Sequence, residues 1–227
     1  MFVYQGKEIM KQVRELFAAG HKSNNKQYYV DLDGIEEPDL ANRFNNIQLK
    51  KISKRKLNSA ESDNYRTPYV PCRYDDALAI LKIPRDHRSG NCDEMSSMSA
   101  FYAHRDYMVA KDRLYIADIG APADHVFCVV TDAGGAGGDV QFDTVTAFTR
   151  SAAAMDWVII DPWLHVCCRG RDYLIKGNEQ LGKWGRGGKR VSWAHGSQGS
   201  GWYPPHGEYK DEFAKGPVTL VGFFSAR

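Results

Sequence analysis

Residues 91–103 limit the possible folds more than any other part of the sequence. Asn91 is a favourable N-cap residue, and Glu94 stands three positions later, which is the spacing of a capping box. We therefore expect a helix over residues 92–109, with Cys92 at its first position. Small side chains on this helix allow close approach to a sheet, namely Ser96, Ser97, Ser99, Ala100 and Ala103. The sequence thus predicts a central helix that packs on a sheet.

The second half of the chain contains most of the strand-like segments. β-Branched and aromatic residues concentrate at residues 113–117, 125–131, 156–160, 173–175 and 218–224. Apolar residues at helical spacing predict an amphipathic helix over residues 8–19, and a short helix is expected over 75–81. Glycine-rich segments at 134–138 and 185–188 are expected to be loops. These elements together predict an α+β fold with an antiparallel sheet.

The length of 227 residues suits one main domain with an N-terminal extension. Residues 21–66 are polar, so we place the extension at residues 1–66 and the main domain at 67–227. No apolar stretch is long enough to span a membrane, and no ordinary secretory signal is visible. The five cysteines are odd in number and irregularly spaced, which favours a reducing compartment over a disulfide framework.

Three residues in chain order have the chemistry of a thiol hydrolase. A helix N-terminus favours a thiolate at Cys92, although the acidic residues that follow it oppose ionisation and make a histidine partner necessary. His125 begins a predicted strand, whose alternation would turn it toward the packed helix and turn Val126 away. Asp161 ends another strand and is expected to orient the imidazole, with Trp163 shielding the pair. Cys92, His125 and Asp161 are thus predicted as nucleophile, base and orienting residue.

The segments 90–94, 124–127 and 161–163 together resemble the three motif blocks of papain-like cysteine hydrolases among bacterial effectors and toxins. The resemblance covers about residues 85–165 and implies a papain-like fold, a Cys-His-Asp triad and no cofactor. It departs from the family's pattern at the oxyanion hole, because residues 85–90 contain no glutamine. We assign that role to the backbone N–H of Cys92, supported by Asn91 or His87.

The resemblance implies an enzyme that attacks an amide of a protein substrate through a thioester. It favours a bacterial protein that leaves its cell by a non-classical route and deamidates glutamine in the cytoplasm of a host cell. A cognate inhibitor protein is a further expectation. Peptide cleavage, or transglutamination and other acyl transfer, remain as alternatives of the same chemistry. A catalytically inactive interaction module is the alternative outside enzymes.

The remaining motifs carry weaker signals. Adjacent Cys167 and Cys168 beside His165 do not have zinc-site spacing, so no metal is expected. The formal charge of +2 is too small to indicate nucleic-acid binding. Two basic clusters are expected to lie on the solvated surface of the protein, where they could also contact an acidic partner or an anionic surface. They consist of Lys50, Lys51, Lys54, Arg55 and Lys56, and of Lys183, Arg186, Lys189 and Arg190 beside Trp184 and Trp193.

Overall fold

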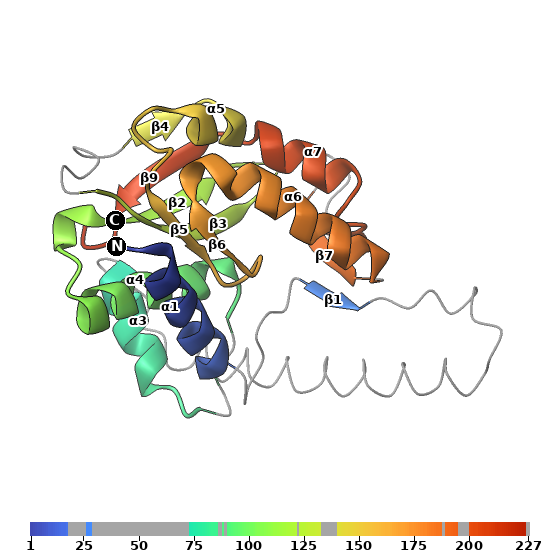
Figure 1. The fold of residues 1–227 in the computed structure, drawn as a ribbon. Helices are drawn as coiled ribbons and strands as arrows, with labels where there is room; N and C mark the ends of the chain where they lie inside the picture. Colours follow the sequence, from blue (N-terminus) through green and yellow to red (C-terminus); the bar gives the residue numbers. More distant parts are fainter. Residues whose placement is uncertain are drawn as a thin grey trace.

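An antiparallel six-stranded sheet forms the centre of the protein in a computed structural model (Figure 1). The structure describes residues 1–17, 26–28, 73–85, 88, 90–121, 123–132, 140–187, 189–194 and 200–225. The strand order is β4-β9-β2-β3-β5-β6, and all neighbouring pairs are antiparallel. The strands are β2 (Leu114–Ile119), β3 (His125–Val130), β4 (Val140–Phe142), β5 (Val158–Asp161), β6 (Val166–Arg169) and β9 (Val218–Gly222).

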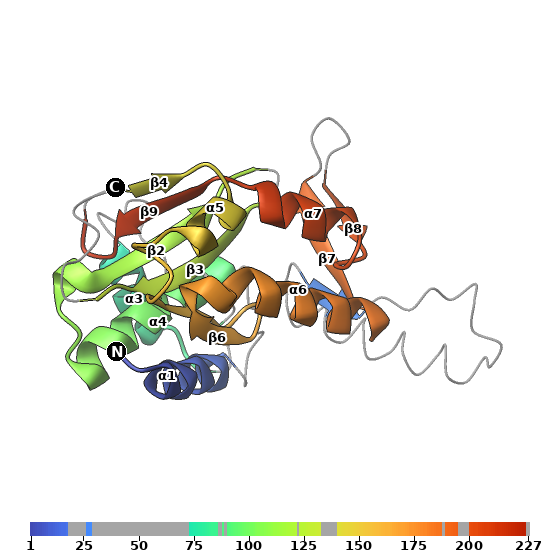
Figure 2. The same cartoon turned by 45° about the horizontal axis from the view of Figure 1, so that its top comes forward.

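Helices cover both faces of this sheet (Figures 1 and 2). On one face α4 packs on β2, β3 and β5, while α1 packs on β5, β6 and α4, and α3 packs on α4. On the other face α6 contacts β5 and β6, and α5 and α7 pack beside it. The helices are α1 (Val3–Leu16), α3 (Arg73–Lys82), α4 (Cys92–Tyr107), η2 (Lys111–Arg113), α5 (Val145–Arg150), α6 (Gly170–Arg186) and α7 (Glu208–Lys215).

Burial on both faces explains why β3 has no polar side. All six of its residues are buried. Alternation puts His125 and Val126 on opposite faces, and helices cover both of these faces. Phe127 contacts Phe148 of α5 and Tyr173 of α6 at ring-centroid distances of 5.9 Å and 4.5 Å. The face that carries His125 and Phe127 is therefore covered by α5, α6 and α7.

A second, three-stranded sheet lies beyond the C-terminal end of α6 (Figure 1). Its order is β1-β7-β8, and both pairs are antiparallel. The strands are β1 (Lys26–Tyr28), β7 (Lys189–Ala194) and β8 (Ser200–Tyr203). It joins β1, from the predicted extension, to β7 and β8 of the predicted main domain.

The helix α1, from the predicted extension, packs into the main core. Ile9 and Val13 are fully buried, and α1 contacts β5, β6 and α4. The close approach depends on Gly6, because a Cβ atom there would lie 2.7 Å from the Sγ of Cys167. The predicted boundary at residue 66 lies outside the described residues.

Several predicted elements need correction. The amphipathic helix starts at Val3, earlier than expected, and α4 ends at Tyr107 where Met108 adopts a left-handed backbone with φ 52°. Residues 173–175 form part of α6 and not a strand, and Gly185, expected in a loop, is also in this helix. The buried positions of α6 repeat every three or four residues and override the local strand preference. The α+β class and the antiparallel sheet are confirmed.

Candidate active site

Cys92 begins α4, as its sequence context predicts. The backbone N–H of Asn91 donates to Oε2 of Glu94 at 2.8 Å, which fixes the start of the helix. The Cys92 side chain is 8% exposed, and its backbone N–H belongs to the first turn, where helical N–H groups have no partner within the helix. Asp93 forms an ion pair with Arg73, so one of the two acidic neighbours of Cys92 is offset by a nearby cation.

His125 begins β3 and is almost completely buried, at 1% exposure. The residue before it, Asp124, has a left-handed backbone with φ 43°, an uncommon conformation that sets the direction in which the chain enters β3. The imidazole packs against Trp163 at 4.8 Å and Phe213 of α7 at 5.9 Å between ring centroids. Trp163, itself 2% exposed, thus covers the ring at the position predicted for a shielding residue.

The carboxylate of Asp161 accepts hydrogen bonds from three donors. Its Oδ2 accepts from Nε2 of His125 at 2.6 Å and from the hydroxyl of Tyr173 at 2.8 Å. Its Oδ1 accepts from the backbone N–H of Leu164 at 2.8 Å. Asp161 is fully buried, so these bonds are what make a charged carboxylate tolerable at the end of β5.

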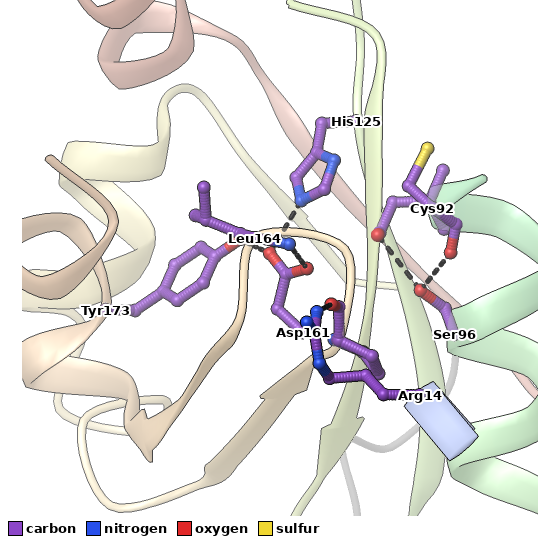
Figure 3. A network of polar contacts seen from close by, with 9 residues as sticks. Arg14, Cys92, Ser96, His125, Asp161, Leu164 and Tyr173 are labelled. Carbon is purple, nitrogen blue, oxygen red and sulfur yellow. Dashed lines mark hydrogen bonds and ion pairs between the residues drawn. The ribbon is translucent and has the colours of Figure 1, made fainter. Parts of the chain in front are cut away.

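The second ring nitrogen of His125, Nδ1, faces Cys92 (Figure 3). Burial lowers the pKa of His125, but the charge and hydrogen bond of Asp161, together with the Cys92 thiol, outweigh it and raise this pKa to about 10. The ring therefore holds a proton at neutral pH, and a protonated imidazole beside the sulfur stabilises a thiolate. The structure brings Cys92, His125 and Asp161 together in the order that the sequence predicts.

Ser96 connects the helix of Cys92 to the strand of His125. Its hydroxyl lies 2.6 Å from the carbonyl oxygen of Cys92 and 2.9 Å from that of Val126, with a single proton shared between the two acceptors (Figure 3). Ser96 is fully buried. The contact fixes the first turn of α4 against the second residue of β3, and so fixes the sulfur relative to the imidazole.

Arg14 of α1 supports the turn that follows Asp161. Its Nη1 donates to the carbonyl oxygen of Pro162 at 3.0 Å. Burial lowers the pKa of Arg14, as expected for a guanidinium withdrawn from water. The N-terminal helix therefore holds the loop between Asp161 and Leu164 in place.

Three site residues were missed by sequence reasoning. Ser96 and Tyr173 look like core or packing residues in the sequence, and no sequence pattern distinguishes Tyr209. Tyr209 is 3% exposed, and burial, then the charges of Cys92 and Asp161, raise its pKa well above the usual value. Tyr173 has a pKa raised in the same way by burial and by Asp161. Both phenols stay protonated, so they can only donate a proton in a hydrogen bond to an anion.

Two more residues were predicted to support the oxyanion hole. Asn91 is the N-cap of α4, and His87 lies outside the described residues.

In the described part of the chain, no three His, Cys, Asp or Glu side chains form a group suited to a metal ion. Burial raises the pKa of Cys128 and Cys168, and raises that of Cys167 to about 12, so these thiols keep their protons at neutral pH.

Among the helices that the structure describes, none has the length and apolar character needed to cross a bilayer.

Searches against protein-family models, characterised proteins and solved structures find no match for the chain.

Proposed function

We propose that this protein is a cysteine hydrolase that attacks an amide of a protein substrate and forms a thioester. The observation that carries the proposal is the chain of contacts from Cys92 through His125 to Asp161, in which each nitrogen of one buried imidazole has its own partner. A buried histidine that merely fills space has no need of a thiol on one nitrogen and a three-fold hydrogen-bonded carboxylate on the other. The resemblance to papain-like hydrolases supports the same reading.

The geometry suggests how each residue acts. The Cys92 sulfur attacks the amide carbon, which forms a C–S bond and places negative charge on the carbonyl oxygen. The backbone N–H of Cys92, in the first turn of α4, stabilises that oxygen. The Nδ1–H of His125 gives its proton to the leaving nitrogen as the C–N bond breaks. Asp161 holds the Nε2–H and stabilises the charged ring throughout.

Water completes the reaction by the same route. It attacks the thioester carbon while Nδ1 of His125 takes its proton, and the C–S bond then breaks to regenerate the resting Cys92–His125 pair. With a glutamine side chain the products are glutamate and ammonia, and with a backbone amide they are two peptides. The resemblance leads us to propose glutamine of a host protein as the substrate, and a bacterial effector or toxin as the biological role.

A thiol-reactive probe gives the first test. Limiting fluorescent iodoacetamide should modify Cys92 in the native protein much faster than Cys167 and Cys168, whose raised pKa keeps them protonated, as read by peptide mapping. Cys168→Ala is the matched control, because it removes a thiol with a raised pKa and should leave the labelling of Cys92 unchanged. Equal labelling of all described cysteines would contradict an activated Cys92.

Host proteins treated with the wild type and with Cys92→Ala identify the reaction. Intact-mass and peptide mapping should show glutamine converted to glutamate only with the wild type. Fragments that appear only with the wild type would show that the reaction is proteolysis. Crosslinked products would show that it is transglutamination. A biological effect that persists in Cys92→Ala would instead support a non-enzymatic interaction module.

A further inference from the structure

A strongly basic surface surrounds the C-terminal turn of α6. We define this cationic edge as Lys183, Arg186 and Lys189, with Arg190 next to it in β7. Lys183 and Arg186 are exposed and lie three positions apart, so they share one side of the helix. Between Gln180 and Glu208 the sequence contains no Asp or Glu. The charge is therefore one-sided in a chain whose overall formal charge is only +2.

The helix dipole accounts for only part of this charge. Cations in the last turn of a helix interact favourably with its C-terminus, which explains Lys183 and Arg186. Lys189 and Arg190 lie beyond the C-cap residue Gly187, where the helix has ended, so the dipole gives no reason for them. A contact with an external anion gives one reason that Lys183, Arg186 and Arg190 share, while Lys189 also contacts the ring of Trp184.

A continuous series of aromatic contacts joins the cationic edge to the candidate active site. The Nζ of Lys189 lies 4.8 Å from the ring centroid of Trp184. Trp184 packs edge-on against Trp163 at 5.3 Å, and Trp163 lies 4.8 Å from His125, both between ring centroids. Both tryptophans are buried, at 5% and 2% exposure. Two indole rings thus separate the cationic edge from the imidazole.

We infer that the cationic edge docks an acidic segment of the protein substrate, next to the residue whose amide is attacked. The inference rests on the proposed function, and it adds the class of substrate. A substrate segment bound there would approach the candidate site from the side of Trp184 and Trp163, the two rings between Lys189 and His125. Exposed charges of this kind mainly speed association and select the partner, and salt weakens them.

The test measures binding separately from chemistry. Cys92→Ala prevents turnover, so fluorescence anisotropy can report its affinity for a short peptide in which one glutamine is flanked by Asp and Glu. A peptide with Lys and Arg in the same positions serves as the comparison. We expect the acidic peptide to bind more tightly, with an affinity that falls as NaCl is added.

Charge reversal locates the contact. Adding Lys183→Glu and Arg186→Glu should weaken binding of the acidic peptide by about tenfold. Lys7→Glu with Lys11→Glu is the matched control, because it reverses two exposed lysines one turn apart on α1 and changes the net charge equally. That control should change the affinity by less than about twofold.

Several outcomes would overturn the inference: equal binding of both peptides, equal losses in the two double variants, or tighter binding of a single-stranded oligonucleotide or of phosphatidylserine vesicles. If the protein is not a cysteine hydrolase, the result differs. Cys92 is then not labelled selectively and glutamine is not converted, while the acidic peptide can still bind more tightly than the basic one.

Discussion

Ser96 on α4 lies within hydrogen-bonding distance of the carbonyl oxygen of Val126 on β3, at 2.9 Å. This single hydroxyl joins the first turn of the helix that carries Cys92 to the start of the strand that carries His125. Replacement of Ser96 by alanine should reduce the labelling rate of Cys92 and lower the free energy of unfolding by about 0.5 to 1.5 kcal/mol. Stopped-flow alkylation and urea unfolding measure the two effects.

Ser99→Ala is the matched control for this prediction. Ser99 is equally buried and donates to the carbonyl oxygen of Met95 at 2.8 Å, four positions earlier, as Ser96 does to Cys92. This bond stays within the helix. A similar loss of Cys92 labelling in both variants would show that the bond from Ser96 to the strand has no special part in placing the sulfur.

Tyr173→Phe removes one of the two donors to Oδ2 of Asp161 and keeps the ring. The ring continues to pack on Phe127 at 4.5 Å and on Phe213 at 5.9 Å, so the change isolates the hydroxyl. Loss of a buried hydrogen bond to a charged acceptor should lower the free energy of unfolding by about 1.5 to 3 kcal/mol. Urea unfolding of the single variants and of the double variant with Asp161→Asn should show non-additive losses. Additive losses would contradict the coupling.

The raised pKa of His125 predicts a pH dependence of stability once Cys92 is absent. In Cys92→Ala the charge and hydrogen bond of Asp161 still act on His125, and we expect them to keep its pKa above the ordinary value of 6.5. Stability from the charged ring is thus fully present below pH 6.5 and is lost as the pH rises through the higher pKa of the folded state.

Urea unfolding of Cys92→Ala from pH 6 to pH 10 should therefore show a falling free energy of unfolding. Asp161→Asn in the same background removes the carboxylate charge, so burial then dominates and lowers the pKa of His125. The fall above pH 6.5 should disappear in that double variant. Its persistence would assign the pH dependence to another group.

Gly6→Ala should destabilise the protein through α1. The new methyl group would lie 2.7 Å from the Sγ of Cys167 and 3.2 Å from a methyl carbon of Val158, so the helix has to move from the sheet at a cost of about 1 to 3 kcal/mol. Gly182→Ala is the control, since a Cβ atom there would meet only the flexible guanidinium of Arg186, with Nη1 at 3.4 Å. Alanine in this helix should instead stabilise the fold by about 0.5 to 1 kcal/mol, as thermal unfolding would show.

The start of α4 was predictable because its signals are local. Asn91 and Glu94 lie within one turn of Cys92, and they determine where the helix begins whatever the rest of the chain does. His125 and Asp161 were placed by the ends of strands that have strong β-branched patterns. The chemistry of the three residue types then suggested that they meet.

The support around the site depends on tertiary contacts that local patterns do not encode. Tyr173 sits in a segment with strand preference, and its role follows only from α6 packing above Asp161. The same applies to Arg14, whose partner lies 148 positions away. The alternation of His125 and Val126 did not reveal a second layer of helices, which buries every residue of β3.

The bond between Arg14 and Pro162 has a consequence for synthesis of the protein. A ribosome makes α1 first, but this helix has no sheet to pack on until β5 and β6 have emerged. Cys92 is likewise made before His125 and Asp161, so the imidazole can have both partners only after β5 has been made. Contacts between such distant residues form late in folding. The nascent chain therefore carries Cys92 without its imidazole contact until the sheet can assemble.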